Sequence, residues 1–300
     1  MIPAILTIGN FDGVHLGHRH LINTTIELAH SWCGRATVIT FAPHPHAFFS
    51  PSPNFFIYPQ QIKERILASF PIDSTIYLPF DKIYRLSPQD FFESVLLPLE
   101  PAAIVLGNNF SFGANKSGDI HLLRRLCANH EIAMHSLSMT LFDNQPVSSS
   151  RIRAAIQSGD IENAGRMLGA PYTLYGTVQH GARRGHTLGF PTANIAPTEQ
   201  VLPKVGVYAS RVRIDDDAEW RDAVTAVTQT PTFEDVRARI ETHILSFDGD
   251  IYGHEIAVRL VAHLRDEVHF ASSESLVAQL NQDCQIARTV LQQSIVGEST

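Results

Sequence analysis

Residues 9–18 read Gly-Asn-Phe-Asp-Gly-Val-His-Leu-Gly-His, and this stretch decides how the first half of the chain folds. An apolar, strand-like run precedes it at residues 5–8, and apolar residues recur after it at the three-to-four spacing of a helix. A strand, a glycine-bearing turn and a helix N-terminus point free backbone N–H groups and the positive end of the helix dipole at one spot. The stretch therefore predicts an anion site, where His15 and His18 could bind a phosphate and stabilise charge as it moves between oxygens.

The same histidine pair has simpler interpretations. The chain contains 15 histidines, so a His-x-x-His pair at a helix start can arise by chance. It can equally be two ligands of a metal ion. The motif therefore needs support from other parts of the sequence.

The composition is that of an ordinary soluble globular protein, with 44% hydrophobic and 18% charged residues among 300. A formal net charge of −7 does not mark a nucleic-acid-binding protein. The three cysteines, Cys33, Cys127 and Cys284, are far apart, which favours reduced thiols in a cytosol. The sequence shows neither a signal-peptide pattern nor an apolar run long enough to cross a bilayer. We therefore expect a cytoplasmic protein without nucleic-acid or membrane partners, and protein partners stay unknown.

The first half of the chain alternates between strand and helix patterns. After the first strand and helix, further strands are predicted at residues 36–41, 74–78, 102–106 and 132–137. Helical patterns lie between them, and this alternation favours a parallel sheet covered by helices. Ligands of such sheets bind beyond the carboxyl ends of the strands, where the strand order switches.

Three further loops are expected at this rim of the sheet. Pro43-His44-Pro45 follows the second strand, residues 107–113 with Asn109 follow the fourth, and the Ser-Ser-Ser-Arg-Ile-Arg run at 148–153 comes after the fifth. Each alone is typical of a cap or a packing loop. Residues 113–118 resemble a phosphate loop superficially, but the glycine that should precede Lys116 is absent, so a Walker-type site is not expected.

The second half has a different pattern. Strands are predicted at residues 174–178, 205–214, 223–228, 240–247 and 255–264, separated by turns rich in Gly, Asp and Pro. This pattern indicates a small antiparallel barrel. Residues 273–294 carry apolar side chains at three-and-four spacing, which predicts one amphipathic helix packed on the barrel. The domain boundary is expected near residues 169–171.

Residues 187–194, Thr-Leu-Gly-Phe-Pro-Thr-Ala-Asn, hold the chemistry of this half. The hydroxyl of Thr192 and the carbonyl of Asn194 follow a Gly/Pro turn and could both reach Mg²⁺ or a phosphate oxygen. From the residues alone, an ordinary β-turn with solvated polar side chains is the favoured interpretation.

Residues 9–18 together with 148–153 resemble the bacterial bifunctional riboflavin kinase/FAD synthetase family, and the Gly-Phe-Pro-Thr-Ala-Asn string resembles the signature of its kinase module. The resemblance covers essentially the whole chain. It implies an α/β nucleotidyltransferase-like domain, with a Rossmann-like parallel sheet, at residues 1–170, which adenylylates FMN. It also implies an antiparallel β-barrel riboflavin kinase-like domain with a long terminal helix at residues 171–300.

The family pattern also implies roles for individual residues of the first domain. His15 and His18 would stabilise the α-phosphoryl transition state. His44 and Pro45 would lie at the flavin. The remaining family positions would bind ATP, namely Gly9, Asn10, Phe11, Asp12, Gly13, Asn109, Ser149, Ser150 and Arg153.

In the second domain, the resemblance assigns Glu241 as the catalytic carboxylate that deprotonates the ribityl hydroxyl of riboflavin. ATP would be bound by Gly189, Pro191, Thr192 and Asn194, with Thr192 and Asn194 also holding Mg²⁺. Thr187 belongs to the same string.

The chain departs from the family pattern at several loops. Asn109 and Ser111 replace an Asp and an Arg, and Ala42 replaces the Asp that often precedes Pro-His-Pro. In the kinase half, residues 180–186 and 226–231 differ from the common motifs. The altered kinase loops leave adenylyl transfer as the stronger prediction.

The predicted function is bifunctional. Riboflavin and ATP would give FMN, and FMN and a second ATP would give FAD and pyrophosphate. One alternative is an FAD synthetase whose kinase module is impaired by its divergent loops. Another is a non-catalytic flavin- or nucleotide-binding regulator, although a pure binder has no need of the intact set of catalytic residues.

Overall fold

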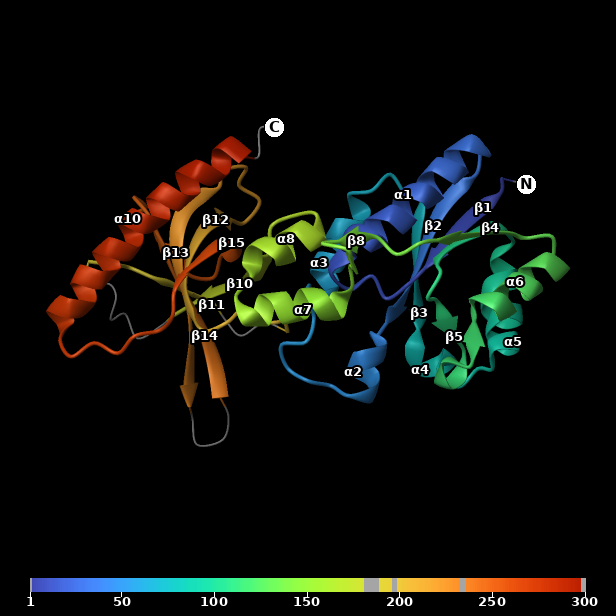
Figure 1. Cartoon of the computed structure of the whole chain (residues 1–300), viewed down its shortest axis with the longest axis horizontal. Helices are drawn as coiled ribbons and strands as arrows, with labels where there is room; N and C mark the ends of the chain where they lie inside the picture. The colour runs from blue at the N-terminus through green and yellow to red at the C-terminus, as the bar shows by residue number, and fades with distance from the viewer. Residues whose placement is uncertain (1, 181–188, 196–198, 232–235, 298–300) are drawn as a thin grey trace. The chain divides into compact units, whose positions relative to one another are not determined.

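The computed structural model describes residues 2–180, 189–195, 199–231 and 236–297 (Figure 1). Contacts divide the chain into two compact units. The first unit comprises Met1–Pro53 and Tyr58–Ser149, and the second comprises Asn54–Ile57 and Ser150–Thr300. The assignment of one activity to residues 1–170 and the other to 171–300 stays a prediction.

The first unit is built on a five-stranded sheet with the order β3-β2-β1-β4-β7. All of its neighbouring strands are parallel. The strands are β1 (Ala4–Ile8), β2 (Arg35–Ala42), β3 (Ser74–Pro79), β4 (Pro101–Gly107) and β7 (Ala133–Leu137). The predicted Rossmann-like sheet is thus confirmed. The chain passes from β1 to β2 on one side and later returns to β4 on the other, so the strand order switches at the carboxyl end of β1.

Helices cover both faces of this sheet (Figure 1). Because side chains of a strand alternate, Ile5 packs with Ala29 of α1 (Leu16–Ser31) on one face, while Leu6 and Ile8 contribute to the core on the other. That second core includes side chains from α5 (Pro88–Phe91), the π-helical turn η2 (Phe92–Leu96), the 3₁₀ turn η3 (Leu97–Leu99) and α6 (Ile120–Asn129). Both strand faces are therefore buried, as parallel sheets require.

Short elements fill the connections of the first unit. They are η1 (Asp12–Val14), α2 (Pro45–Phe49), α3 (Gln60–Ala68), α4 (Phe80–Ile83), β5 (Ser111–Phe112), η4 (Ala114–Lys116), β6 (Gly118–Asp119), β8 (Leu141–Phe142) and β9 (Gln145–Pro146). Most are too short to leave a periodic pattern, and the two hairpins β5–β6 and β8–β9 were not predicted. The connection η4 lies between antiparallel strands, so residues 113–118 lack the strand-loop-helix context of a phosphate loop.

The second unit is a closed barrel with the order β10-β11-β14-β13-β12-β15. Its strands are β10 (Thr173–Gln179), β11 (Ala193–Ile195), β12 (Gly206–Ile214), β13 (Arg221–Pro231), β14 (Val236–Ile244) and β15 (Glu255–Arg265). The predicted antiparallel barrel is confirmed. The short strand β11 was expected to be a turn, and β14 ends at Ile244 rather than at residue 247 because Ser246 takes a left-handed φ of 57°.

A chain of hydroxyl groups runs through the buried part of the barrel. Ser210 and Thr225 lie 2.7 Å apart, Thr225 and Thr242 lie 3.0 Å apart, and all three residues are fully buried. These three hydroxyl groups satisfy one another across three adjacent strands, so their burial leaves none of the three without a hydrogen bond.

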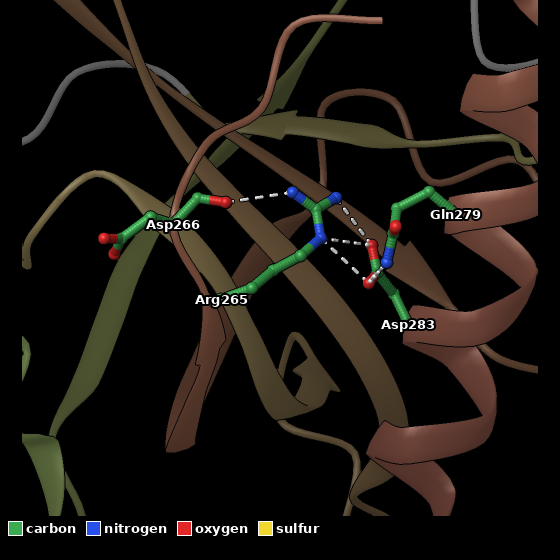
Figure 2. Close-up of polar contacts among 4 residues, drawn as sticks. All are labelled: Arg265, Asp266, Gln279 and Asp283. Carbon is green, nitrogen blue, oxygen red and sulfur yellow. Dashed lines mark hydrogen bonds and ion pairs between the residues drawn. The ribbon is translucent and has the colours of Figure 1, made fainter.

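The helix α10 (Ser273–Gly297) packs on the outside of the barrel through Ala287 and Leu291, which confirms the predicted terminal helix. Figure 2 shows the ion pair and the hydrogen bonds that hold α10 on the barrel. Arg265, the last residue of β15, donates from Nε and Nη2 to the two oxygens of the buried Asp283 at 2.9 and 2.7 Å, and Gln279 donates to the same carboxylate at 2.9 Å. This forked ion pair fixes the helix to the strand.

Two helices, α7 (Ser149–Ser158) and α8 (Ile161–Leu168), precede the barrel, and α8 ends at Gly169 in a left-handed conformation. The segment Asn54–Ile57 is also part of this unit. The N–H of Phe56 donates to the carbonyl of Glu199, the N–H of Val201 donates to the carbonyl of Phe56, and the fully buried Gln200 donates to the carbonyl of Ile57. In the described residues, no helix is long and apolar enough to cross a membrane.

Candidate functional site

The turn between β1 and α1 has an unusual backbone. Phe11, Gly13 and Val14 take positive φ values of 50°, 80° and 41°. Glycine adopts a positive φ freely, whereas a β-branched valine adopts one only when the surrounding structure forces it. Phe11 and Val14 are fully buried, and their packing in the core holds the turn in place. The strain lies at the switch point of the sheet, which is where a ligand is expected.

This turn delivers two stacked imidazoles. The rings of His15 and His18 lie 3.6 Å apart between centroids at 15°, and the edge of Phe11 meets the His18 ring at 5.1 Å. His15 caps helix α1, because its Nδ1 accepts a long hydrogen bond of 3.4 Å from the N–H of His18. A Cβ on Gly17 would approach the His15 ring to 3.2 Å, so glycine leaves room for the ring. The predicted His-x-x-His pair is therefore one packed unit at a helix N-terminus.

The His18 side chain is half-buried, and its pKa departs from that of an ordinary histidine. Burial is the largest cause that holds its pKa well below the ordinary value, and the charges of His15 and Lys63 act in the same direction. Its Nδ1 is buried without a hydrogen-bond partner. An imidazole with a buried, unsatisfied polar atom at a helix N-terminus is suited to an anionic ligand, which would supply the missing contact and favour the protonated form of the ring.

The serine-rich run meets this turn at its first helical residue. The hydroxyl of Ser149 donates to the carbonyl of Asp12 at 3.0 Å, so Ser149 is fixed to the predicted phosphate turn within the first unit. Ser150 and Arg153 follow on α7 within the second unit. The Arg153 guanidinium lies over the ring of Phe55, with its Cζ 4.1 Å from the ring centroid.

The other predicted loops of the first unit also have defined conformations. Asn109 is exposed in the turn after β4, which is closed by a bond from the N–H of Phe110 to the carbonyl of Gly107. His44 caps α2, where its Nδ1 accepts from the N–H of His46 at 3.1 Å and Pro45 occupies the first helical position. The loop expected here therefore opens directly into a short helix.

An aromatic cluster follows the Pro-His-Pro loop. Phe48 lies 5.6 Å from Phe80 and 4.9 Å from Tyr84 between ring centroids, and Phe49 contacts both at 5.6 and 5.8 Å. Phe49 is 62% exposed, which is unusual for so large an apolar side chain. The sequence interpretation stopped at His44 and Pro45, although the Phe48-Phe49 pair was a visible signal for an aromatic platform.

In the barrel, the register brings two predicted residues together. Asn194 of β11 is the direct cross-strand partner of Glu241 of β14. Directly opposed residues of an antiparallel pair project to the same face, with Cβ atoms about 5 Å apart. Ala193 and Ile195 are buried, whereas Asn194 and Glu241 are half-buried. The amide and the carboxylate therefore share a partly open face of the barrel.

The preceding turn is anchored to the same strand. His243 of β14 donates from Nδ1 to the carbonyl of Pro191 at 2.8 Å, and its ring meets that of Phe190 at 5.4 Å. Gly189 takes a φ of 84°. His243 was not singled out in the sequence. Thr187 and most of the divergent loop at 180–186 lie outside the described residues.

Metal binding by the histidine pair finds no support among the parts of the chain that the structure describes, because no three His, Cys, Asp or Glu side chains gather as ligands there. The arrangement is that of an anion site in an α/β unit and an amide–carboxylate pair on a barrel. Together they define a two-module protein that combines a nucleotidyltransferase-type sheet with a kinase-type barrel.

Comparison with known proteins identifies the family. A family model of FAD synthetase matches residues 2–151, and a riboflavin kinase model matches residues 168–291. The chain is 35% identical to the bifunctional riboflavin kinase/FMN adenylyltransferase of Listeria monocytogenes, over 96% of this chain and 92% of that protein. It is 33% identical to the protein of the same name in Escherichia coli K12, over 95% and 92%. The chain belongs to the bifunctional riboflavin kinase/FMN adenylyltransferase family.

The fold is also shared with a solved structure. A crystal structure described as that of a macrolide-efflux protein from Streptococcus pneumoniae superposes with a TM-score of 0.87 at 30% sequence identity. The match covers 96% of this chain and 94% of the pneumococcal chain.

Proposed function

We propose that the first unit transfers the adenylyl group of ATP to FMN. The phosphate oxygen of FMN attacks the α-phosphorus, the bond from that phosphorus to the bridging oxygen breaks, and pyrophosphate leaves. Such an in-line displacement needs positioning and charge stabilisation but no protein nucleophile. The observation that carries the proposal is the stacked pair His15 and His18 on a strained turn at the switch point of the sheet.

The roles of individual residues follow from this chemistry. His18 donates a hydrogen bond to the α-phosphoryl oxygens as charge builds on them, and His15 holds the His18 ring by stacking. The N–H groups of the turn and the helix start bind the other phosphate oxygens. The further ATP contacts are assigned to Gly9, Asn10, Phe11, Asp12, Gly13, Asn109, Ser149, Ser150 and Arg153.

FMN is assigned to the side of the Pro-His-Pro loop. The flavin ring is flat and apolar, and the exposed Phe49 with Phe48, Phe80 and Tyr84 offers ring faces and edges for it. His44 and Pro45 lie at the start of the same helix and belong to this flavin site.

The barrel is assigned the preceding reaction, in which the terminal ribityl hydroxyl of riboflavin attacks the γ-phosphorus of ATP and ADP leaves. Glu241 accepts the proton of that hydroxyl. The cross-strand pairing of Glu241 with Asn194 supports this role, because it places the base beside the strand that would carry the phosphates. Gly189, Pro191, Thr192 and Asn194 form the ATP-binding edge.

The residues of this edge fit Mg²⁺. Thr192 and Asn194 lie two positions apart in extended chain and offer hydroxyl and carbonyl oxygens, the hard ligands that Mg²⁺ prefers. When bound, the ion would neutralise charge on the phosphate oxygens. Thr192 and Asn194 orient the phosphates, and Glu241 holds the proton taken from the flavin.

The two proposed reactions are consecutive, since the FMN made in the barrel is the substrate of the first unit. The matches to both family models and to bifunctional relatives favour this pair of reactions over the two alternatives, an FAD synthetase with an impaired kinase and a non-catalytic flavin- or nucleotide-binding regulator. Cytoplasmic location is likewise a proposal, supported by the free cysteines Cys33, Cys127 and Cys284 and by the need for ATP.

The test is to incubate the purified full chain with ATP and Mg²⁺ and to separate the flavins by chromatography. Riboflavin should give FMN and then FAD, and added FMN should give FAD with stoichiometric pyrophosphate. If FMN is converted but riboflavin is not, the kinase assignment fails. If neither flavin changes, both enzymatic assignments fail and the regulator interpretation gains support.

A further inference from the structure

A lysine is buried beneath the phosphate turn. Lys63 lies on α3, which packs against η1, and only 3% of its surface is exposed. Its helix otherwise turns apolar side chains such as Ile62 and Leu67 inward. An ammonium group in such a position loses hydration that a methionine of similar length would not need. The sequence interpretation did not use Lys63, and its burial calls for a function.

Lys63 interacts with both ends of the segment from Asn10 to Asp12. Its Nζ donates to the fully buried hydroxyl of Thr40 at 3.4 Å, and that hydroxyl donates to the carbonyl of Asn10 at 3.2 Å. The carboxylate of Asp12, which is only 4% exposed, is the opposite charge that acts most strongly on the ammonium. Lys63 therefore supports the segment from Asn10 to Asp12 from its buried side.

The same charge acts on His18. The Lys63 ammonium is one of the causes that lower the pKa of His18, after burial and the neighbouring His15. Lys63 thus bears on the geometry of the turn and on the protonation of the imidazole at its end. With so little of its surface exposed, it is not placed to bind the substrate itself.

We propose that Lys63 is a positioning residue for adenylyl transfer, which holds the Asn10–Asp12 turn through Thr40 and Asp12 and so sets the orientation and charge of His18. This inference rests on the proposed function of the first unit. It goes beyond that function because it makes the rate of adenylyl transfer depend on Lys63, a buried cation outside the His-x-x-His and serine-rich motifs.

The charge of Lys63 can be changed within an accessible pH range. Burial lowers its pKa to about 8, while the negative charges of Asp12 on η1 and Glu64 on its own helix act in the opposite direction. His18 on α1 is the titratable group of that helix whose pKa the charge of Lys63 lowers. The ammonium is therefore present below pH 8 and is lost above it, and adenylyl transfer should decline there.

The experiment compares the Lys63→Met and Lys63→Arg variants of the full chain with the wild type. Lys63→Met should lower kcat for FAD formation on the order of 10²-fold, the cost of a small misplacement of reacting groups, with little change in KM for ATP. Riboflavin phosphorylation by the same preparation should be unchanged. Arg65→Met removes an exposed cation two residues further along α3 and should leave both activities intact.

The pH profile separates positioning from mere stability. The wild type should lose adenylyl transfer as Lys63 deprotonates near pH 8. Lys63→Arg keeps its charge and should retain activity above that pH. In Lys63→Met the decline near pH 8 should be absent, because the group that titrates there has been removed.

Unchanged kcat and an unchanged pH profile in Lys63→Met would overturn the inference. So would an arginine variant that loses activity at the same pH as the wild type, which decides the question even if the methionine variant does not fold. A wild-type chain that makes no FAD from FMN would instead refute the proposed function itself.

Discussion

The guanidinium of Arg153 lies over the ring of Phe55, with its Cζ 4.1 Å from the ring centroid. Phe55 is followed by Phe56, whose N–H and carbonyl are both bonded to the 199–201 segment. The segment around Phe55, which follows the Pro-His-Pro loop in the sequence, therefore holds Arg153 in place. Arg153 is one of the residues assigned to the phosphates of ATP. The stack restricts the rotamers of a long side chain before any ligand binds.

Replacing Phe55 by Leu should weaken ATP binding in the adenylylation reaction. The loss of about 0.5–1 kcal/mol of cation–π energy corresponds to a rise of about 2- to 5-fold in KM for ATP. Steady-state kinetics with FMN as substrate measures it. In the Arg153→Ala background, Phe55→Leu should add nothing further, because the two changes remove the same contact. Equal effects in both backgrounds would show that Phe55 acts independently of Arg153.

Replacing His18 by Ala should abolish FAD formation, on the order of 10²- to 10³-fold in kcat, because one hydrogen-bond donor to the developing charge is lost. Total formation of FMN from riboflavin should remain, since Glu241 lies in the other unit. His20→Ala is the matched control, because His20 is an exposed residue of the same helix. Loss of both activities in a folded His18→Ala variant would contradict two independent active sites.

Binding of ATP should be accompanied by proton uptake at His18. The free protein holds the pKa of this ring well below the ordinary value, so the ring is neutral near pH 7. A polyphosphate stabilises the charged form and raises the pKa, and a proton is then taken up. Calorimetric titrations in buffers of different ionisation enthalpy should show this uptake in the wild type and a smaller one in His18→Gln. The same uptake in both proteins would exclude His18 as its source.

The sequence predicts the fold where periodicity is strong. All five parallel strands leave short runs rich in apolar and β-branched residues, the terminal helix leaves an apolar pattern of about three and a half residues, and the structure has them. The strand β11 is only Ala193–Ile195, too short for a pattern, and it is held by pairing with β14, which lies far along the chain. Such tertiary pairing is invisible to local propensity.

The candidate site is predictable to a similar extent. Motif spacing indicates His15 and His18, but it contains no information about their stacking or about the buried Lys63 behind them. Lys63 looks like a surface residue in the sequence, because only the packing of α3 on η1 decides which side of the helix is buried. The sequence does not reveal the role of His243 either, since its hydrogen bond to the Pro191 carbonyl depends on the barrel register.

Replacing Glu241 by Gln should abolish riboflavin phosphorylation while FAD formation from added FMN continues. The amide keeps the size of the side chain but cannot accept the proton of the ribityl hydroxyl, and the loss of a general base costs about 10²- to 10⁴-fold. Glu274→Gln, an exposed position at the start of α10, is the control. If the Glu241→Gln variant still phosphorylates riboflavin at the wild-type rate, another group must be the base.

Replacing Asp283 by Ala should destabilise the second unit. Asp283 has 1% of its side chain exposed and Arg265 has 20%, so the variant leaves a largely buried guanidinium without its carboxylate (Figure 2). Breaking such a pair costs about 3 kcal/mol. Thermal unfolding followed by circular dichroism, together with the temperature at which riboflavin phosphorylation is lost, measures the effect.

The neighbouring Asp266 supplies the matched control for this ion pair. Arg265 also donates to the backbone carbonyl of Asp266 at 3.0 Å, and this bond survives in Asp266→Ala. The Asp266 carboxylate itself pairs with Lys204 at the surface, where side-chain ion pairs contribute little to stability. Asp266→Ala should therefore unfold close to the wild-type temperature, while Asp283→Ala unfolds earlier and loses kinase activity before adenylyl transfer. Equal destabilisation by the two changes would mean that the buried pair does not fix α10 to the barrel.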